Sequence, residues 1–236
     1  MDKKHVSKVY SILASGIALS GVSGYLASYG FFPEALVYLG LLLVTISEIV
    51  YLFTRHSKFA KEVLSPYSYY AATICVGGLF GCLLAEFSGE ELVALKRIML
   101  SAFVITASIF VSASIFAFLT VRRVLIYLGC IIASLVLSLI GIFVFRGPFS
   151  AILGLVVGVL YVVVDTQIMI KKFENGLSEP YEDARHLFYD LVKVFIEIMK
   201  ILGALEKKEK KEKKKKRRKV KERVGKMTVI FFDILL

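Results

Sequence analysis

Asp165 is the only charged residue in the apolar segment 149–170. Because a helix rises about 1.5 Å per residue, this segment would extend roughly 33 Å and cross a bilayer core of about 30 Å. On insertion scales, an aspartate within such a span costs about 2.5 to 3.5 kcal/mol unless it faces protein or water. Gly154, Gly158 and Asp165 share one helix face, and the Gly-x-x-x-Gly spacing favours close approach by another helix. We therefore expect the Asp165 carboxylate to point into a helix bundle, either as a structural hydrogen-bond anchor or as a functional acid.

A second acid lies in the helical pattern of segment 186–205. Four polar residues recur there at spacings of three, four and three: Asp190, Lys193, Glu197 and Lys200. They form one polar stripe along an otherwise apolar helix. An amphipathic helix on the membrane surface has such a stripe, and so does a bundle helix that turns a polar face towards a water-filled path. The pattern leaves both interpretations open.

Asp165 and Asp190 could act together if their helices bring them into contact. Two carboxylates close together in a low-dielectric bundle cannot both be ionised comfortably, so the pair would share a proton and clamp the helices. Loss of that proton would replace the clamp with repulsion and leave oxygen ligands of the kind that calcium prefers. In the alternative, Asp190 pairs with Lys193 in its own helix and never meets Asp165. Glu48 is a further acid, but its position close to a predicted span end is typical of an interfacial residue.

The composition is typical of a polytopic membrane protein. Hydrophobic residues make up 57% of the chain and the mean hydropathy is +0.73, which is too apolar for a soluble domain of this size. The formal charge of +11 is concentrated in one stretch, because fourteen of the 30 Lys and Arg residues lie within 207–226. A basic tail on a membrane protein indicates contact with anionic lipid, and we expect no nucleic-acid partner. The sequence has no phosphate-binding loop, metal-binding set or nucleophile motif, so we predict neither an enzyme nor a bound cofactor.

The elements that must position the two aspartates are membrane helices. We predict an all-α polytopic protein with six transmembrane helices and a seventh C-terminal membrane helix, either spanning or re-entrant, at 9–29, 35–53, 69–87, 98–121, 124–145, 149–170 and 186–205. Residues 1–205 would form the membrane domain. Residues 206–226 would be a disordered Lys/Arg-rich tail and residues 227–236 a short apolar extension.

The distribution of basic residues predicts the orientation of these helices. Eleven basic residues fall on the N-terminal side of the six spans and three on the other side, which favours a cytoplasmic N-terminus. If segment 186–205 crossed fully, the basic tail would be exported. We favour a cytoplasmic tail, where each basic residue near an anionic membrane surface would contribute about 1 kcal/mol of attraction.

Four stretches carry a resemblance to a known family: HVSKVYSILA near the start, SAFVITASIFVSASIFAFLTVRRVLIYLGC, VVVDTQIMIKK, and FYDLVKVFIEIMKILGALEKKEKKEKKKKRR near the end. Over about residues 4–219 the chain resembles the Bax inhibitor-1 (transmembrane Bax inhibitor motif) family. The resemblance implies a seven-helix or six-plus-one bundle in the endoplasmic reticulum membrane. It also implies a pH-sensitive calcium leak and suppression of stress-induced cell death.

The resemblance also implies roles for particular residues. In bacterial members two aspartates form a hydrogen-bonded pair that shuts the pore, and they correspond to Asp165 and Asp190 in this sequence. A basic residue before the third span engages the pair in the family, which makes Lys61 or Arg55 its candidate here. We predict a calcium leak gated by the aspartate pair. The alternative is a non-conducting regulatory protein that binds anionic lipid or other membrane proteins through its basic tail.

Overall fold

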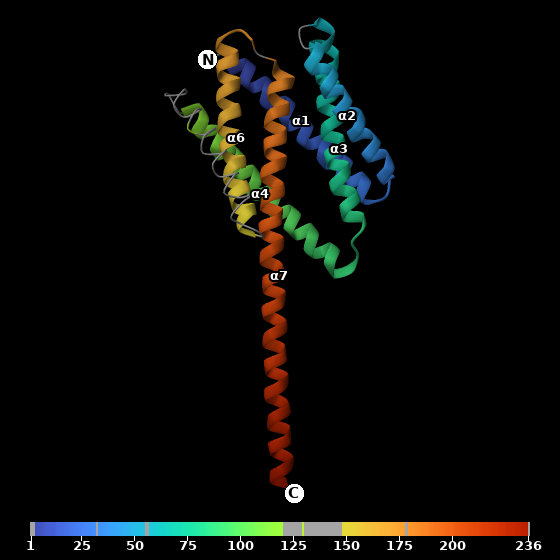
Figure 1. The fold of residues 1–236 in the computed structure, drawn as a ribbon, viewed down its shortest axis with the longest axis vertical. Helices are drawn as coiled ribbons and strands as arrows, with labels where there is room; N and C mark the ends of the chain where they lie inside the picture. The colour runs from blue at the N-terminus through green and yellow to red at the C-terminus, as the bar shows by residue number, and fades with distance from the viewer. Residues whose placement is uncertain are drawn as a thin grey trace.

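The computed structural model describes residues 3–31, 33–54, 57–119, 129, 148–177 and 179–235. The described residues contain no strand, which confirms the all-α class (Figure 1). The elements are α1 (Lys3–Ser28), α2 (Glu34–Thr54), the π-helical turn η1 (Ala60–Leu64), α3 (Ser65–Ala85), α4 (Gly89–Leu119), α6 (Pro148–Glu174) and α7 (Pro180–Leu235). The predicted fifth span, at 124–145, lies outside the described residues.

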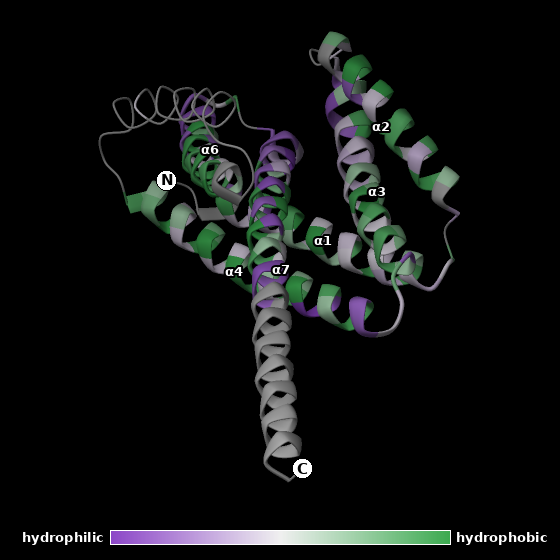
Figure 2. Cartoon of the chain, turned by 60° about the horizontal axis from the view of Figure 1, so that its bottom comes forward, coloured by the Kyte–Doolittle hydropathy of each residue, from purple (hydrophilic) through white to green (hydrophobic). Residues whose placement is uncertain are grey.

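Four of the described helices are long and apolar enough to cross a membrane: His5–Ser28, Ala60–Ala85, Gly89–Leu119 and Ala151–Glu174. They correspond to the predicted first, third, fourth and sixth spans. The predicted second span forms a shorter apolar helix, Ala35–Tyr51. Hydrophobic residues extend along all of these helices (Figure 2), as expected for a polytopic membrane protein. The described residues therefore support four spans and do not reproduce the predicted count of seven.

Helices α1 and α3 run parallel and pack closely through glycines. A Cβ atom on Gly24 would lie 2.9 Å from the carbonyl oxygen of Gly77, so no side chain fits at this position. Further along the same contact, the buried Tyr69 hydroxyl donates a hydrogen bond to the carbonyl of Ile12 at 2.9 Å. Aromatic and aliphatic side chains of α1, α3, α4, α6 and α7 meet around Tyr69 and form the main core.

Helix α7 lies alongside α6, and the predicted glycine face of α6 makes this contact. A Cβ atom on Gly158 would lie 2.9 Å from Val194, and one on Gly154 would lie 2.8 Å from Glu197. The close approach predicted from the Gly-x-x-x-Gly spacing is confirmed. It fixes the register in which α7 presents its polar stripe to α6.

Helix α7 continues as one helix of 56 residues and extends beyond the bundle (Figure 1). Helix α7 has no re-entrant turn, which was one of the two alternatives for 186–205, and it continues through 206–226, where disorder was expected. The physical reason is local: Lys, Glu and Arg are strong helix formers, and no proline follows Pro180. The N-terminus and the α6–α7 turn lie at one end of the bundle, and the tail leaves at the other. The cytoplasmic location of both ends stays a prediction.

Candidate functional site

Helix α6 carries Asp165 into the contact with α7. The Asp165 side chain is 21% exposed. Two residues later, the buried Gln167 amide donates a hydrogen bond to the backbone carbonyl of Ala117 on α4, which holds this turn of α6 against a second helix. The Asp165 carboxylate therefore points into the bundle, as its sequence context predicts.

Helix α7 brings Asp190 to Asp165. Asp190 is 8% exposed, and its carboxyl group lies close enough to Asp165 for the two charges to interact, while its Oδ2 atom is buried without a hydrogen-bond partner among the described residues. The structure thus brings the predicted pair together. The alternative, in which Asp190 pairs only with Lys193, is not observed. The Lys193 ammonium group instead lies over the Tyr161 ring, 4.3 Å from its centroid.

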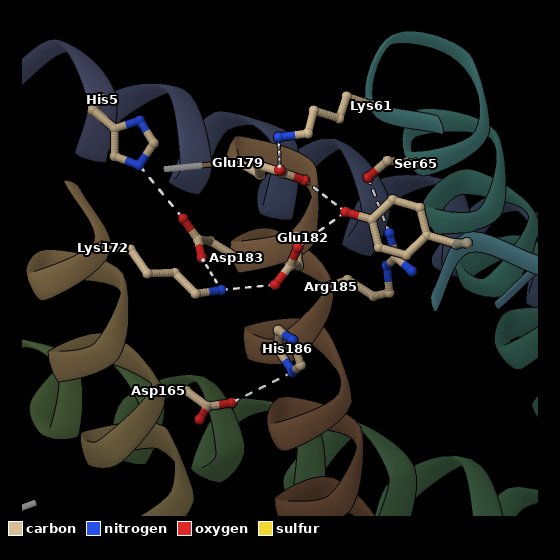
Figure 3. A network of polar contacts seen from close by, with 11 residues as sticks. His5, Lys61, Ser65, Asp165, Lys172, Glu179, Glu182, Asp183, Arg185 and His186 are labelled. Carbon is tan, nitrogen blue, oxygen red and sulfur yellow. Dashed lines mark hydrogen bonds and ion pairs between the residues drawn. The ribbon is translucent and has the colours of Figure 1, made fainter. Parts of the chain in front are cut away.

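His186 is a third member of the site that sequence reasoning missed. It lies one helical turn before Asp190, and its Nδ1 is 3.9 Å from Oδ2 of Asp165 (Figure 3). The signal was present in the sequence, because residues four apart share one helix face. The imidazole is 56% exposed, so His186 connects the buried pair to solvent.

The remaining stripe residues also face α6. Glu197 packs against Gly154, and Lys200 donates a hydrogen bond to Glu197 at 2.8 Å. The stripe that begins at Asp190 therefore lies in the contact between two bundle helices. This placement favours the bundle interpretation over a helix lying flat on the membrane surface.

A dense set of ion pairs lies above the aspartate pair, at the start of α7 (Figure 3). Among them, Glu179, just before α7, pairs with Lys61 of η1 at 2.6 Å, Glu182 with Lys172 of α6 at 2.7 Å, and Asp183 with His5 of α1 at 3.5 Å. The Tyr51 hydroxyl of α2 donates to Glu179 at 2.6 Å and to Glu182 at 2.9 Å. We call this network the polar cap: His5, Glu48, Tyr51, Lys61, Ser65, Lys172, Glu179, Glu182, Asp183 and Arg185.

Arg185 is one of the buried residues of the polar cap. Its guanidinium group binds the Glu48 carboxylate, donates to the Ser65 hydroxyl at 3.0 Å and lies 4.9 Å from the centre of the Tyr51 ring. Only 5% of the Arg185 side chain is exposed, so its charge depends on these partners. Glu48 is thus a cap residue and does not join Asp165 as a further acid.

One of the two predicted basic partners, Lys61, binds Glu179 in the polar cap and not the aspartate pair. The other, Arg55, lies outside the described residues. The charged groups that face the pair are His186 on α7 and, at longer range, Lys172 on α6 and Lys193 on α7. These three residues would favour the ionised form of the pair.

The two neighbouring acids of the cap differ in their acidity. Burial raises the pKa of Asp183, although the charges of Lys172 and His5 oppose the shift. Burial also acts to raise the pKa of Glu182, but the hydrogen bond and charge of Lys172, together with the Tyr51 hydroxyl, lower it below its ordinary value. The cap therefore favours an ionised Glu182 and resists ionisation of Asp183.

A family model described as "Inhibitor of apoptosis-promoting Bax1" matches residues 2–207, which include the aspartate pair and the whole polar cap. The chain belongs to the Bax inhibitor-1 family. The Bax inhibitor 1 homolog of Dictyostelium discoideum is 33% identical over 219 residues, covering 87% of this chain and 83% of that protein. Bax inhibitor 1 of Drosophila melanogaster is 29% identical and covers 87% and 84%. Human Bax inhibitor 1 is 29% identical and covers 87% of both chains.

These relatives confirm the resemblance seen in the sequence. The match to the Bax inhibitor-1 family model ends at residue 207, so most of the basic stretch 207–226 lies outside it. The membrane bundle is the part of the chain that the family shares. Within the described residues, no group of three His, Cys, Asp or Glu side chains is arranged to hold a metal ion.

Proposed function

We propose that this Bax inhibitor-1 family protein is a pH-sensitive calcium leak channel of the endoplasmic reticulum membrane that suppresses stress-induced cell death. Asp165 and Asp190 would form its gate. The observation that carries the proposal is the contact between these two acids, on adjacent helices, with His186 beside them. Calcium is the permeant ion in this proposal, and no resident cofactor is required.

The proposed gate works through one shared proton. With the proton present, a hydrogen bond between Asp165 and Asp190 holds α6 against α7. Without it, two unit charges about 4 Å apart repel by about 4 kcal/mol at an effective dielectric constant of 20. That energy is enough to change the ratio of closed to open states by roughly a thousandfold. The exposed carboxylate oxygens then provide hard ligands for a passing calcium ion.

Calcium flux from liposomes containing the purified full chain tests the proposal between pH 6 and pH 8. We expect flux to rise with pH in the wild type, because the shared proton is lost. Asp165→Asn and Asp190→Asn keep the shape of the pair but remove the titrating proton, so each should abolish the pH dependence. Glu91→Gln, on the exposed first turn of α4, is the matched control. Absence of flux at every pH from folded protein would reject conduction.

The regulatory alternative is supported by a different observation, the continuation of α7 beyond the bundle as a basic helix. In that case the tail binds anionic lipid or other membrane proteins, and the bundle serves as its anchor. Removing residues 207–236 should then abolish protection from cell death, while Asp165→Asn leaves protection unchanged. The conduction proposal predicts that Asp165→Asn abolishes protection.

A further inference from the structure

A cavity of about 310 Å³ lies between α1, α3, α4 and α7. On α7 it is lined by Phe188, Leu191, Val192 and Phe195, which fall on the face opposite the Asp190 stripe. The cavity is therefore separate from the proposed gate.

The lining of the cavity is apolar along most of its length and polar at one end. Side chains such as Val76 and Phe80 of α3 form its walls, and Phe188 closes the end near the core. The other end lies where α1 and α3 finish and α4 begins. Lys96 lies there, together with the hydroxyl groups of Ser28 and Tyr29.

Lys96 gives this end a positive charge. Its side chain is exposed, and no ion pair within the described part of the chain engages its ammonium group. Lysine commonly places its alkyl stem along an apolar surface and its charged group at the membrane boundary. The cavity thus combines an apolar channel with a cation at its mouth.

We propose that this cavity binds a free fatty acid, with the alkyl chain between α1, α3 and α7 and the carboxylate on Lys96. The apolar lining suits an alkyl chain. A carboxylate at Lys96 would form a charge-assisted hydrogen bond, which a neutral alcohol of the same length cannot form. The ligand class follows from the apolar lining and from the charge at the mouth.

The probe for this site is a diazirine-bearing dodecanoic acid, cross-linked by light to the full chain in phosphatidylcholine nanodiscs. Saturable labelling should map to peptides of α1, α3 and α7. Unlabelled dodecanoate should compete about tenfold more strongly than dodecanol. Labelling that does not saturate, or that maps elsewhere, would overturn the proposal.

Two sets of variants test whether labelling depends on the cavity or on the rest of the protein surface. A Cβ atom on Gly21 meets nothing within 4 Å, so Gly21→Leu should fill the cavity without a clash and reduce labelling about tenfold. Gly203→Leu is the control, because its Cβ also meets open space and Gly203 does not line the cavity. Val192→Phe fills the cavity from α7 and tests the same point independently. Unchanged labelling in both filled variants would overturn the proposal.

The second pair tests the charge. Lys96→Gln should remove the preference for dodecanoate over dodecanol and leave dodecanol competition unchanged. Arg97→Gln, which neutralises the adjacent residue outside the cavity lining, should preserve the preference. An equal effect of both substitutions would assign the preference to general surface charge and reject Lys96 as the carboxylate partner.

Discussion

Lys172 contacts two consecutive acids of α7, Glu182 at 2.7 Å and Asp183 at 3.5 Å. The closer contact with Lys172 helps to lower the pKa of Glu182 despite its burial, whereas the longer contact leaves the pKa of Asp183 raised. A lowered carboxyl pKa stabilises the fold at pH values above it. A raised one costs stability once the group ionises. The two neighbours therefore contribute opposite pH dependences to the same cap.

Glu182→Gln and Asp183→Asn should show these opposite signs in thermal unfolding measured from below pH 4 to pH 8. At pH 7, Glu182→Gln should lower the free energy of unfolding by about 1 to 3 kcal/mol, because the Lys172 partner is lost. This loss should shrink as the pH falls through the lowered pKa of Glu182. Asp183→Asn should gain stability relative to the wild type as the pH rises through the raised pKa of Asp183. A change of the same sign in both variants would contradict the assignment.

His186 should set the pH range of the proposed gate. A protonated imidazole 3.9 Å from Asp165 favours the ionised pair, so His186→Gln should shift the flux–pH curve to higher pH. The shift should be smaller than about one pH unit, because the imidazole is half exposed and solvent screens its charge. Liposome flux measured in steps of pH provides the test. No shift, or one to lower pH, would remove His186 from the site.

Part of the site could be predicted from residue types and spacing. Asp165 stands out as a lone acid in an apolar span, and the resemblance supplied its partner Asp190. The cap could not be predicted, because an ion pair such as Arg185 with Glu48 joins residues 137 positions apart and leaves no periodic signature. Lys61 was assigned to the wrong acid for the same reason.

At the scale of elements, glycines decide how closely the helices pack. The Cβ of Gly24→Ala would meet the backbone oxygen of Gly77 at 2.9 Å, which cannot move without shifting α3. The Cβ of Gly158→Ala would meet the tip of the Val194 side chain, also at 2.9 Å, and a side chain yields more easily than backbone. The α1–α3 contact is therefore less tolerant than the α6–α7 contact.

Alanine substitutions should rank the two contacts by thermal stability. We expect Gly24→Ala to lower the free energy of unfolding by about 2 to 3 kcal/mol, and Gly158→Ala to lower it by about 1 kcal/mol. Gly21→Ala, whose Cβ meets open space, should stabilise its helix by up to about 1 kcal/mol and serves as the control. If Gly24→Ala and Gly158→Ala lower the free energy of unfolding equally, α3 can move away from α1.

The sequence predicted which helices exist better than where they end. We placed the start of the fourth span at residue 98, but α4 begins at Gly89. Glu90 and Glu91 lie in its first turn, where negative charge is favourable, so residues that look like a loop continue the helix. The tail was misjudged because its charge density hid the high helix propensity of its residues.

At the scale of the whole molecule, the unbroken path of α7 makes a prediction about topology. Because α7 does not turn back, the N-terminus and the tail leave the bundle at opposite ends. Epitope tags at the two termini should therefore show opposite protease protection in sealed membrane vesicles. Equal protection of both tags would mean that α7 does not cross the membrane.

The bundle holds α7 from the polar cap to Leu202, and the rest of the helix projects from it as an arm. The arm from Gly203 to Leu235 is roughly 50 Å long, so a tilt of about 5° where the helix leaves the bundle would displace its far end by about 4 Å. A small change of angle in the contact between α6 and α7 would therefore reach the tail as a larger displacement. A partner that restrains the tail would act on that contact with the same mechanical advantage.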